Sequence, residues 1–146
     1  MQIFLGADHR GFELKNRIAE WLQDQYIPFT DFGATTYDAE DDYNDCAKAV
    51  AHAILNNHEP DTFGVLVCNS AQGVSMQANR FKGIRAAICH NPNECIETRG
   101  HNDANILCIA ADQHENDFAE IINTFIHSSP LPDPKYQRRK QKLDED

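Results

Sequence analysis

The sequence predicts an α/β protein with a doubly wound, Rossmann-like parallel sheet of five strands, helices on both faces of the sheet and a basic C-terminal tail helix. Short apolar runs alternate along the chain with longer segments in which apolar residues recur at helical spacing. That alternation is typical of repeated β-α units. The run from Phe63 to Val67 is almost continuously apolar, which indicates a strand buried on both faces, as in a parallel sheet.

The expected strands comprise residues 2–6, 27–32, 63–68, 84–89 and 104–110. The expected helices comprise residues 11–25, 46–54, 74–79, 92–99 and 117–126. In the first helix, Leu14, Ile18 and Leu22 follow the i, i+4 spacing of a buried face. Residues 100–103 are expected to form a polar turn. Asn44 or Asp45 is expected to cap the second helix.

Length and composition indicate one globular unit. The chain has 146 residues, of which 41% are hydrophobic and 25% are charged, and this suffices for a single core. We expect residues 1–130 to form the α/β domain. Residues 131–146, a basic tail after a proline-rich linker, are expected to pack on a neighbouring subunit. The alternative for the tail is a solvated, frayed end.

The net charge limits the kinds of partner that we expect the protein to bind. The net charge is −10, which argues against nucleic acid and against an anionic membrane as partners. No apolar segment is long enough to span a bilayer, and Met1 leads directly into a strand. We therefore expect a cytoplasmic protein.

Cysteine and histidine usage argues against a metal. The five cysteines are Cys46, Cys68, Cys89, Cys95 and Cys108, and no Cys-x-x-Cys pair occurs. This pattern disfavours a disulfide framework or a zinc site and favours reduced thiols. The seven histidines are scattered, without a His-Glu-x-x-His motif. We expect neither a metal nor another cofactor.

The chain is organised around the stretch from Thr62 to Arg80. Its strand ends at Cys68, and a small polar loop and a helix follow. Open α/β sheets bind ligands at the carboxyl ends of their strands, and free N–H groups at a helix start favour an anion. A helix N-terminus also lowers the pKa of a thiol, so we expect Cys68 to supply a thiolate base or nucleophile. The alternative is a structural role, because unpaired cysteines are commonly buried as small hydrophobic residues.

Further candidates for acid–base chemistry stand near other strand ends. Asp8 and His9 follow the first strand, Tyr43 precedes the second helix, and Ser70 follows Cys68. Tyr43 closes an acidic loop whose earlier part, residues 38–41, we interpret as a solvated connector.

His101 and Asn102 precede the fifth strand. They would therefore reach this edge of the sheet from a neighbouring subunit. Arg138 and Arg139 lie in the tail. A carboxylate, a thiol, imidazoles and guanidinium groups together suit acid–base chemistry on a small anionic metabolite.

Residues 6–15, Gly-Ala-Asp-His-Arg-Gly-Phe-Glu-Leu-Lys, resemble the opening of the type B ribose-5-phosphate isomerases, a family that includes galactose-6-phosphate isomerase subunits. The resemblance continues through Asp42-Tyr43, residues 68–79 and residues 99–105, and it covers nearly the whole chain. The presence of both Asp8-His9 and His101-Asn102 favours the ribose side of the family.

The resemblance implies a metal-independent aldose–ketose isomerase that interconverts ribose 5-phosphate and ribulose 5-phosphate through an enediolate. It implies that Cys68 is the base that moves a proton between C1 and C2. Asp8 and His101 would assist ring opening, and Ser70 would stand beside the sugar oxygens. Backbone N–H groups of residues 70–74 would stabilise the enediolate, as in an oxyanion hole.

The substrate-binding residues implied by the resemblance are His9, Tyr43, Asn69, Ala71, Gln72, Gly73, Val74, Asn102, Lys135, Arg138 and Arg139. Among them, His9 and Arg139 would hold the phosphate. The resemblance also implies a homodimer or a dimer of dimers, with each site built from two subunits.

Several positions depart from the family pattern. Asn69 and Ala71 replace loop glycines, so the loop either avoids positive φ or accepts strain. Asp112 and Lys135 replace arginines. Because arginine offers phosphate a planar fork of donors, we expect ribose 5-phosphate to bind more weakly here than to relatives with all the arginines.

Other functions are compatible with the same scaffold. One is a non-catalytic module that binds a sugar phosphate or nucleotide, and the altered loop favours it. Another is an isomerase for a different sugar, such as a hexose 6-phosphate or a free sugar. A flavodoxin-like FMN carrier is disfavoured, because the chain lacks obvious paired aromatic loops for stacking a flavin. The joint presence of Asp8, Cys68 and His101 favours an isomerase.

Overall fold

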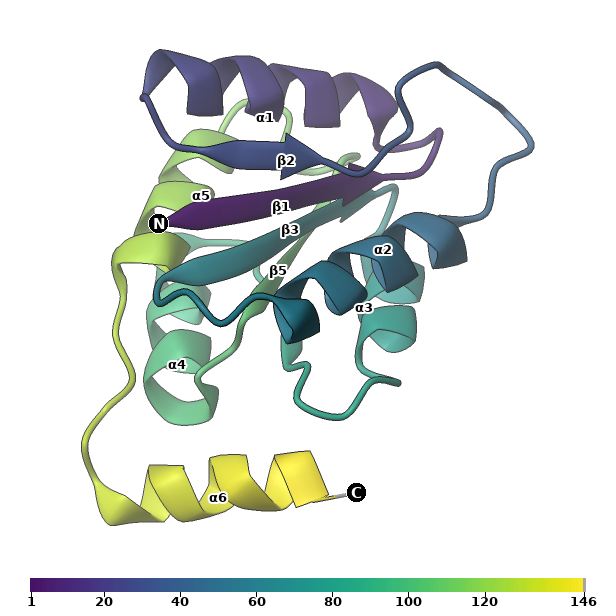
Figure 1. Cartoon of the computed structure of the whole chain (residues 1–146). Coiled ribbons are helices and arrows are strands. Elements are labelled where there is room, and N and C mark those ends of the chain that lie inside the picture. The colour runs from purple at the N-terminus through teal and green to yellow at the C-terminus, as the bar shows by residue number, and fades with distance from the viewer. Residues whose placement is uncertain (146) are drawn as a thin grey trace.

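The computed structural model describes residues 1–145, which contain a five-stranded, all-parallel sheet (Figure 1). The strands are β1 (Gln2–Ala7), β2 (Phe29–Asp31), β3 (Thr62–Cys68), β4 (Ala86–Ile88) and β5 (Ile106–Ala110), in the spatial order β2-β1-β3-β5-β4. The chain leaves β1 toward β2 and then returns to form β3 on the other side of β1. The carboxyl ends of β1 and β3 therefore flank the topological switch point, where open α/β sheets bind ligands. The predicted fold class is confirmed.

Helices cover both faces of the sheet. The helices α1 (Phe12–Asp24), α4 (Pro92–Asn102) and α5 (Phe118–His127) contribute to one apolar core, whereas α2 (Tyr43–Asn56) and α3 (Gln72–Ala78) contribute to the other. The central strand β3 serves both cores. Its Val65 and Val67 side chains belong to the first core, and those of Leu66 and Cys68 belong to the second. The apolar run therefore marks a strand buried on both faces, as predicted.

Some predicted bounds were too wide. The edge strands β2 and β4 are each three residues long, where six were expected. An edge strand pairs with only one neighbouring strand, so its ladder contains only the residues that pair with that neighbour. β5 begins at Ile106, two residues later than expected.

The end of α4 was predicted wrongly. Residues 100–102 belong to the helix rather than to a turn, and Asp103 ends it in a left-handed conformation with φ of 50°. The N–H group of Asp103 closes the last turn on the carbonyl oxygen of Arg99 at 3.1 Å. Asn91 caps the start of the helix by accepting a hydrogen bond from the Glu94 N–H at 3.0 Å.

The predicted cap of α2 was also wrong. Asp42 occupies the N-cap position, and it makes no side-chain cap hydrogen bond. The Asn44 side chain instead donates to the Gln77 Oε1 atom at 2.7 Å. Asn44 therefore joins α2 to α3 rather than capping its own helix.

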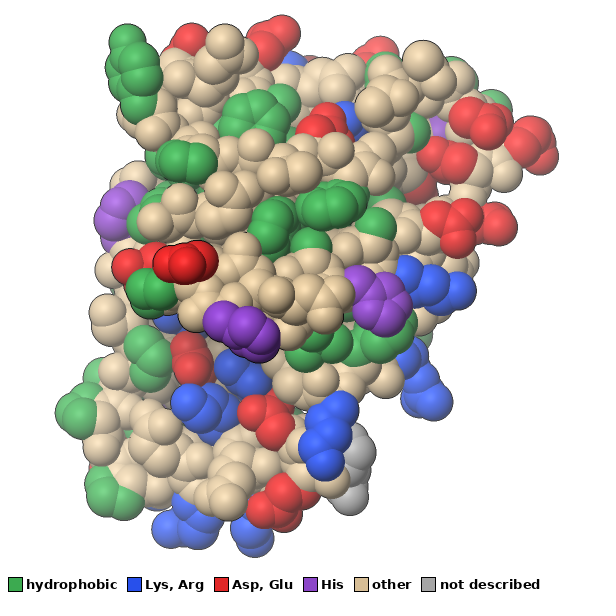
Figure 2. All heavy atoms as spheres, viewed as in Figure 1, with side chains coloured by type: hydrophobic (Ala, Val, Ile, Leu, Met, Phe, Trp, Pro, Cys, Tyr) green, Lys and Arg blue, Asp and Glu red, His purple; other side chains and the backbone are tan. Residues whose placement is uncertain are grey.

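The tail forms a helix, α6 (Pro134–Glu145), that lies against α4 of its own chain (Figure 1). Lys140 pairs with Asp103 at 3.1 Å, and Arg85 pairs with Asp144 at 2.9 Å. The helical conformation is confirmed, while packing of the tail on a neighbouring subunit stays a prediction. Figure 2 shows acidic side chains gathered over the loop between β2 and α2, and lysine and arginine side chains around α6.

Gly11 determines how closely α1 approaches the sheet. It occupies the N-cap position of α1, and a Cβ atom there would lie 2.3 Å from the backbone oxygen of Val67. The backbone fixes the positions of both the Cβ atom and the Val67 oxygen, so no side-chain rotation relieves this contact. Only glycine lets α1 begin directly against β3.

We therefore expect Gly11→Ala to lower the free energy of unfolding by about 1–3 kcal/mol, the typical cost of overpacking. Urea denaturation followed by circular dichroism measures this change. The control is Gly100→Ala inside α4, where the new Cβ would meet the Leu131 side chain at an ordinary 3.4 Å. Because alanine favours helix over glycine by roughly 0.5–1 kcal/mol, that variant should be at least as stable as the wild type. Equal stability of Gly11→Ala and wild type would contradict the packing argument.

Candidate active site

The switch point brings together a carboxyl group and a thiol. Ala7 pairs with Val67 in the ladder between β1 and β3, so Asp8 and Cys68 follow at adjacent positions. Both are nearly buried, with 6% of each residue exposed. Burial is the main cause that raises the pKa of the Cys68 thiol, and the nearby negative charge of Asp8 acts in the same direction. The two predicted neighbours thus form a compact carboxyl–thiol pair.

The loop after β3 wraps backbone N–H groups around the sulfur of Cys68. Burial raises the pKa of the Cys68 thiol above its ordinary value, and the N–H groups of Val74, Ala71 and Ser70 act in the opposite direction. We predicted from the helix N-terminus that the pKa would be lowered, and the net direction of that prediction was wrong. Desolvation of the thiolate outweighs the N–H groups because the strand end is covered by protein on both faces.

Ala71 holds this loop in a strained shape. Its φ of 64° is in the left-handed region, and its side chain is completely buried. Such a conformation costs a non-glycine residue roughly 1–3 kcal/mol. We expected that a loop without these glycines would either avoid positive φ or accept strain. Ala71 adopts positive φ and accepts the strain, whereas Asn69 avoids positive φ.

Asp8 is held by the turn that follows β1. Its Oδ1 atom accepts hydrogen bonds from the N–H groups of Arg10 and Gly11, each at 3.0 Å. Burial nevertheless raises the pKa of the Asp8 carboxyl, against these donors and the nearby His9. Asp8 therefore holds a proton more readily than an exposed aspartate, as suits a group that donates and accepts protons.

His9 is fixed by Asp41. The Nδ1 atom of His9 lies 2.7 Å from the Asp41 Oδ1 atom, and the His9 backbone N–H donates to the same oxygen at 2.9 Å. Because a carboxylate only accepts hydrogen bonds, Nδ1 carries the hydrogen in this contact and Nε2 is directed elsewhere. The interpretation of Asp41 as a solvated connector was wrong. Its partner lies 32 positions away in the chain, and local composition gave no signal of it.

Tyr43 lies over the start of α3. A Cβ atom on Gly73 would come within 2.8 Å of the Tyr43 ring, so the ring packs directly on the glycine backbone. Ser70 is exposed beside them, and its hydroxyl accepts from the Gln72 N–H at 3.4 Å. Asn69 belongs to the same edge, because its carbonyl oxygen accepts from the N–H of Asp112 at 3.3 Å. The structure thus gathers the predicted residues of segments 8–9, 43 and 68–74 at one edge.

The remaining predicted site residues lie at the opposite end of the same sheet. His101 and Asn102 are the exposed last residues of α4, just before β5 begins. A five-residue strand such as β5 spans about 16 Å at roughly 3.3 Å per residue. His101 therefore cannot reach Cys68 of its own chain. Their meeting across two subunits stays a prediction.

His101 has a partner that the sequence did not indicate. Its ring stacks on Tyr136 of α6, with centroids 4.7 Å apart and an interplanar angle of 17°. Lys135 lies over the same tyrosine ring, with its Nζ atom 4.8 Å from the centroid. The tail therefore holds the His101 ring and places Lys135 nearby, while Arg138 and Arg139 are exposed on the same helix.

Comparison with known proteins identifies the family. The sequence model of the family described as Ribose/Galactose Isomerase matches residues 3–143, so the chain belongs to that family. The ribose-5-phosphate isomerase B of Mycobacterium tuberculosis is 33% identical over 145 residues, which cover 99% of this chain and 86% of that protein.

Solved structures agree with this assignment. The ribose 5-phosphate isomerase of Thermotoga maritima superposes with a TM-score of 0.91 at 36% identity, covering 99% of this chain and 98% of that one. The ribose-5-phosphate isomerase B of Mycoplasma genitalium, solved with bound ribulose 5-phosphate, gives a TM-score of 0.90 at 32% identity, covering 97% and 93%. The resemblance found in the motifs is confirmed along the whole chain.

No helix in residues 1–145 combines the length and apolar character needed to cross a membrane. No group of three or more histidine, cysteine, aspartate or glutamate side chains in the same range is arranged to hold a metal ion.

The raised pKa of Cys68 leads to a test of its protonation. Only the thiolate is alkylated, so its reaction with iodoacetamide should keep accelerating beyond about pH 8.5, the value of an unperturbed thiol. Mass spectrometry of the peptide that contains Cys68 separates it from the four other buried cysteines, and Cys68→Ser confirms the peptide. A rate that levels off well below pH 8.5 would show that the N–H groups outweigh burial.

Proposed function

We propose that this protein interconverts ribose 5-phosphate and ribulose 5-phosphate through an enediolate, as an aldose–ketose isomerase. The observation that carries the proposal is the buried Cys68 thiol, set among three backbone N–H groups and beside Asp8 at the switch point. The family and the Mycoplasma genitalium relative with bound ribulose 5-phosphate support the choice of substrate.

In the proposed reaction, Cys68 removes the proton from C2 of the open-chain aldose and returns it to C1, while the hydroxyl proton passes from O2 to O1. The enediolate formed in between carries negative charge on its oxygens. The N–H groups of Ser70, Ala71 and Val74 already converge near the sulfur, so they are placed to stabilise that charge without reorganisation. A thiolate with a raised pKa is a strong base, which suits the weak acidity of a carbon-bound proton.

Ring opening needs a second pair of groups, one that removes the proton from the anomeric hydroxyl and one that protonates the ring oxygen. We assign this pair to Asp8 and to His101 of a second subunit. The raised pKa of Asp8 favours proton exchange by this carboxyl group. His101 is exposed, and it is oriented by its stack on Tyr136.

The proposed phosphate site combines His9 with Lys135, Arg138 and Arg139 of the neighbouring tail. Tyr43, Asn102 and residues 69–74 line the sugar, and the assembly is a homodimer or a dimer of dimers. This arrangement places a cationic tail from one subunit opposite an acidic edge of another. We further propose that the protein works in the cytoplasm without nucleic-acid or membrane partners, in keeping with its charge of −10.

Asp112 supports a second candidate, an isomerase for another sugar. Its backbone lies against Asn69 at the ligand-binding edge, and a carboxylate there repels a phosphate. A panel of pentose and hexose phosphates with the free sugars alongside tests both candidates. Turnover of ribose 5-phosphate with inert free sugars supports the first, and the reverse supports the second.

The role of Cys68 predicts the behaviour of Cys68→Ala. The variant should fold, because alanine fits the space of a buried cysteine, and isomerisation should be abolished because the base is missing. Incorporation of solvent deuterium at C2 of the substrate, followed by NMR, measures the proton transfer directly. Exchange at the wild-type rate in the folded variant would eliminate Cys68 as the base.

The shared site predicts complementation between two inactive proteins. Cys68→Ala and His101→Ala homodimers should each be inactive. Mixed dimers formed by subunit exchange should regain activity, because one of their two sites retains both residues. Differently tagged subunits allow the mixed species to be purified before assay. Absence of activity in the purified mixed dimer would count against a site shared in this way.

A further inference from the structure

Arg10 stands at the rim of the proposed active site. It is exposed and follows Asp8 and His9 in the turn after β1. Its Nη2 atom lies 3.4 Å from the Asn69 Oδ1 atom, which places the guanidinium group beside the loop that surrounds Cys68.

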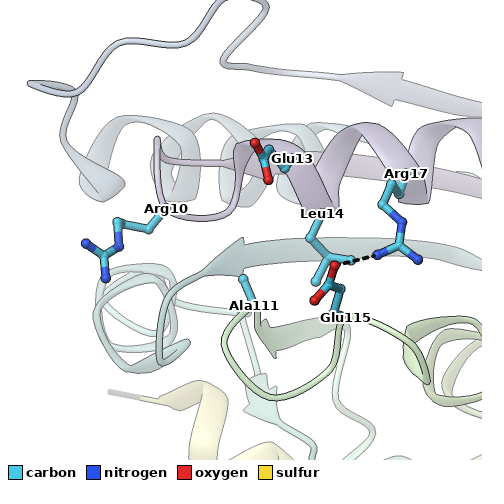
Figure 3. A pocket seen from close by; sticks show the side chains of 6 residues that line it. All are labelled: Arg10, Glu13, Leu14, Arg17, Ala111 and Glu115. Atoms are coloured by element: carbon cyan, nitrogen blue, oxygen red, sulfur yellow. Dashed lines mark ion pairs between the residues drawn. The ribbon is translucent and has the colours of Figure 1, made fainter.

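The surroundings of Arg10 differ from those of the nearby Arg17. Both line a shallow cavity of about 170 Å³ between α1 and the segment after β5. Arg17 pairs with Glu115 at 3.6 Å, whereas within residues 1–145 no carboxylate oxygen lies within 4 Å of the Arg10 guanidinium nitrogens. Figure 3 shows the Arg10 side chain directed away from Glu13 and Glu115.

The ligand-binding edge of the sheet carries several carboxylates, so a nearby guanidinium group is important for binding an anion there. Asp8, Asp41 and Asp112 all stand at or beside the carboxyl ends of the strands, and they repel an anionic substrate. Lys15 is 1% exposed and is engaged with Asp31. The cationic tail helix α6 lies against α4, away from the carboxyl ends of β1 and β3 (Figure 1). Arg10 is therefore an exposed permanent cation that lies beside the loop around Cys68.

We infer that Arg10 binds the phosphate group of the substrate from the same subunit that carries Cys68. The inference rests on the proposed function and adds a specificity residue to it. The Asn69 amide holds one end of the guanidinium group through an uncharged contact, and the other donors of the planar fork remain for phosphate oxygens. Arg10 thereby offsets the repulsion from Asp112 and lets a phosphorylated sugar bind at an acidic edge.

The test replaces Arg10 by methionine, which keeps the length of the side chain and removes its charge. Losing a charge-assisted hydrogen bond should raise the KM for ribose 5-phosphate about tenfold to a hundredfold, with a smaller effect on kcat. Arg10→Lys should recover part of the loss, because it restores charge without the fork. Arg17→Met, which removes a cation from the same cavity, should keep the wild-type KM.

A binding measurement separates this inference from the proposed function. Inorganic phosphate, followed by ³¹P NMR titration, should bind Arg10→Met about tenfold or more weakly than wild type. If the wild-type protein isomerises no pentose phosphate, the proposed function fails, and the phosphate titration still decides the role of Arg10. Equal phosphate affinity and equal KM in wild type and Arg10→Met overturn the inference. The same loss in Arg17→Met also overturns it, because the effect would then be one of overall charge.

Discussion

The candidate site depends on the parallel pairing of β1 with β3. These are the two strands from which the chain departs in opposite directions, so their carboxyl ends leave an open crevice. The register sets Ala7 against Val67, and the next residues, Asp8 and Cys68, therefore emerge together. Gly11 allows α1 to start within contact of the Val67 backbone, which closes the turn over Asp8 and buries it. The packing at the centre of the sheet thereby positions the Asp8 carboxyl group beside the Cys68 thiol.

Burial and backbone dipoles oppose each other at Cys68. Removal from water favours the neutral thiol, while three N–H groups favour the thiolate, and burial prevails in raising the pKa. The consequence is a thiol that is seldom ionised at neutral pH and whose thiolate is strongly basic. The strained backbone of Ala71 belongs to the same balance, because its left-handed conformation shapes the loop whose N–H groups face the sulfur. An enediolate oxygen entering this loop would meet donors that are already oriented.

Most of the fold and one half of the site could be predicted from the sequence. The apolar run of β3 and the residues after it gave the position of Cys68, because burial on both faces and a strand end are local features. The pKa of Cys68 could not be predicted, since it depends on how α2, α3 and the sheet together exclude water. The hydrogen bond between His9 and Asp41 could not be predicted either, because the two residues lie 32 positions apart in the chain. The stack of His101 on Tyr136 likewise joins two helices whose packing no local pattern reveals.

The distribution of charge explains why the candidate residues occupy two ends of one subunit. An acidic chain that placed Lys135, Arg138 and Arg139 beside Asp8 and Asp41 would neutralise its own ligand-binding groups through internal ion pairs. Instead, acidic partners such as Asp103 and Asp144 fix other cations, Lys140 and Arg85, along the contact between α6 and the domain. Arg138 and Arg139 remain exposed at the far end of the sheet. Association of two subunits, as proposed, would then bring the exposed cations of α6 to an acidic edge. The resulting attraction would favour both the assembly and an anionic substrate held between the two surfaces.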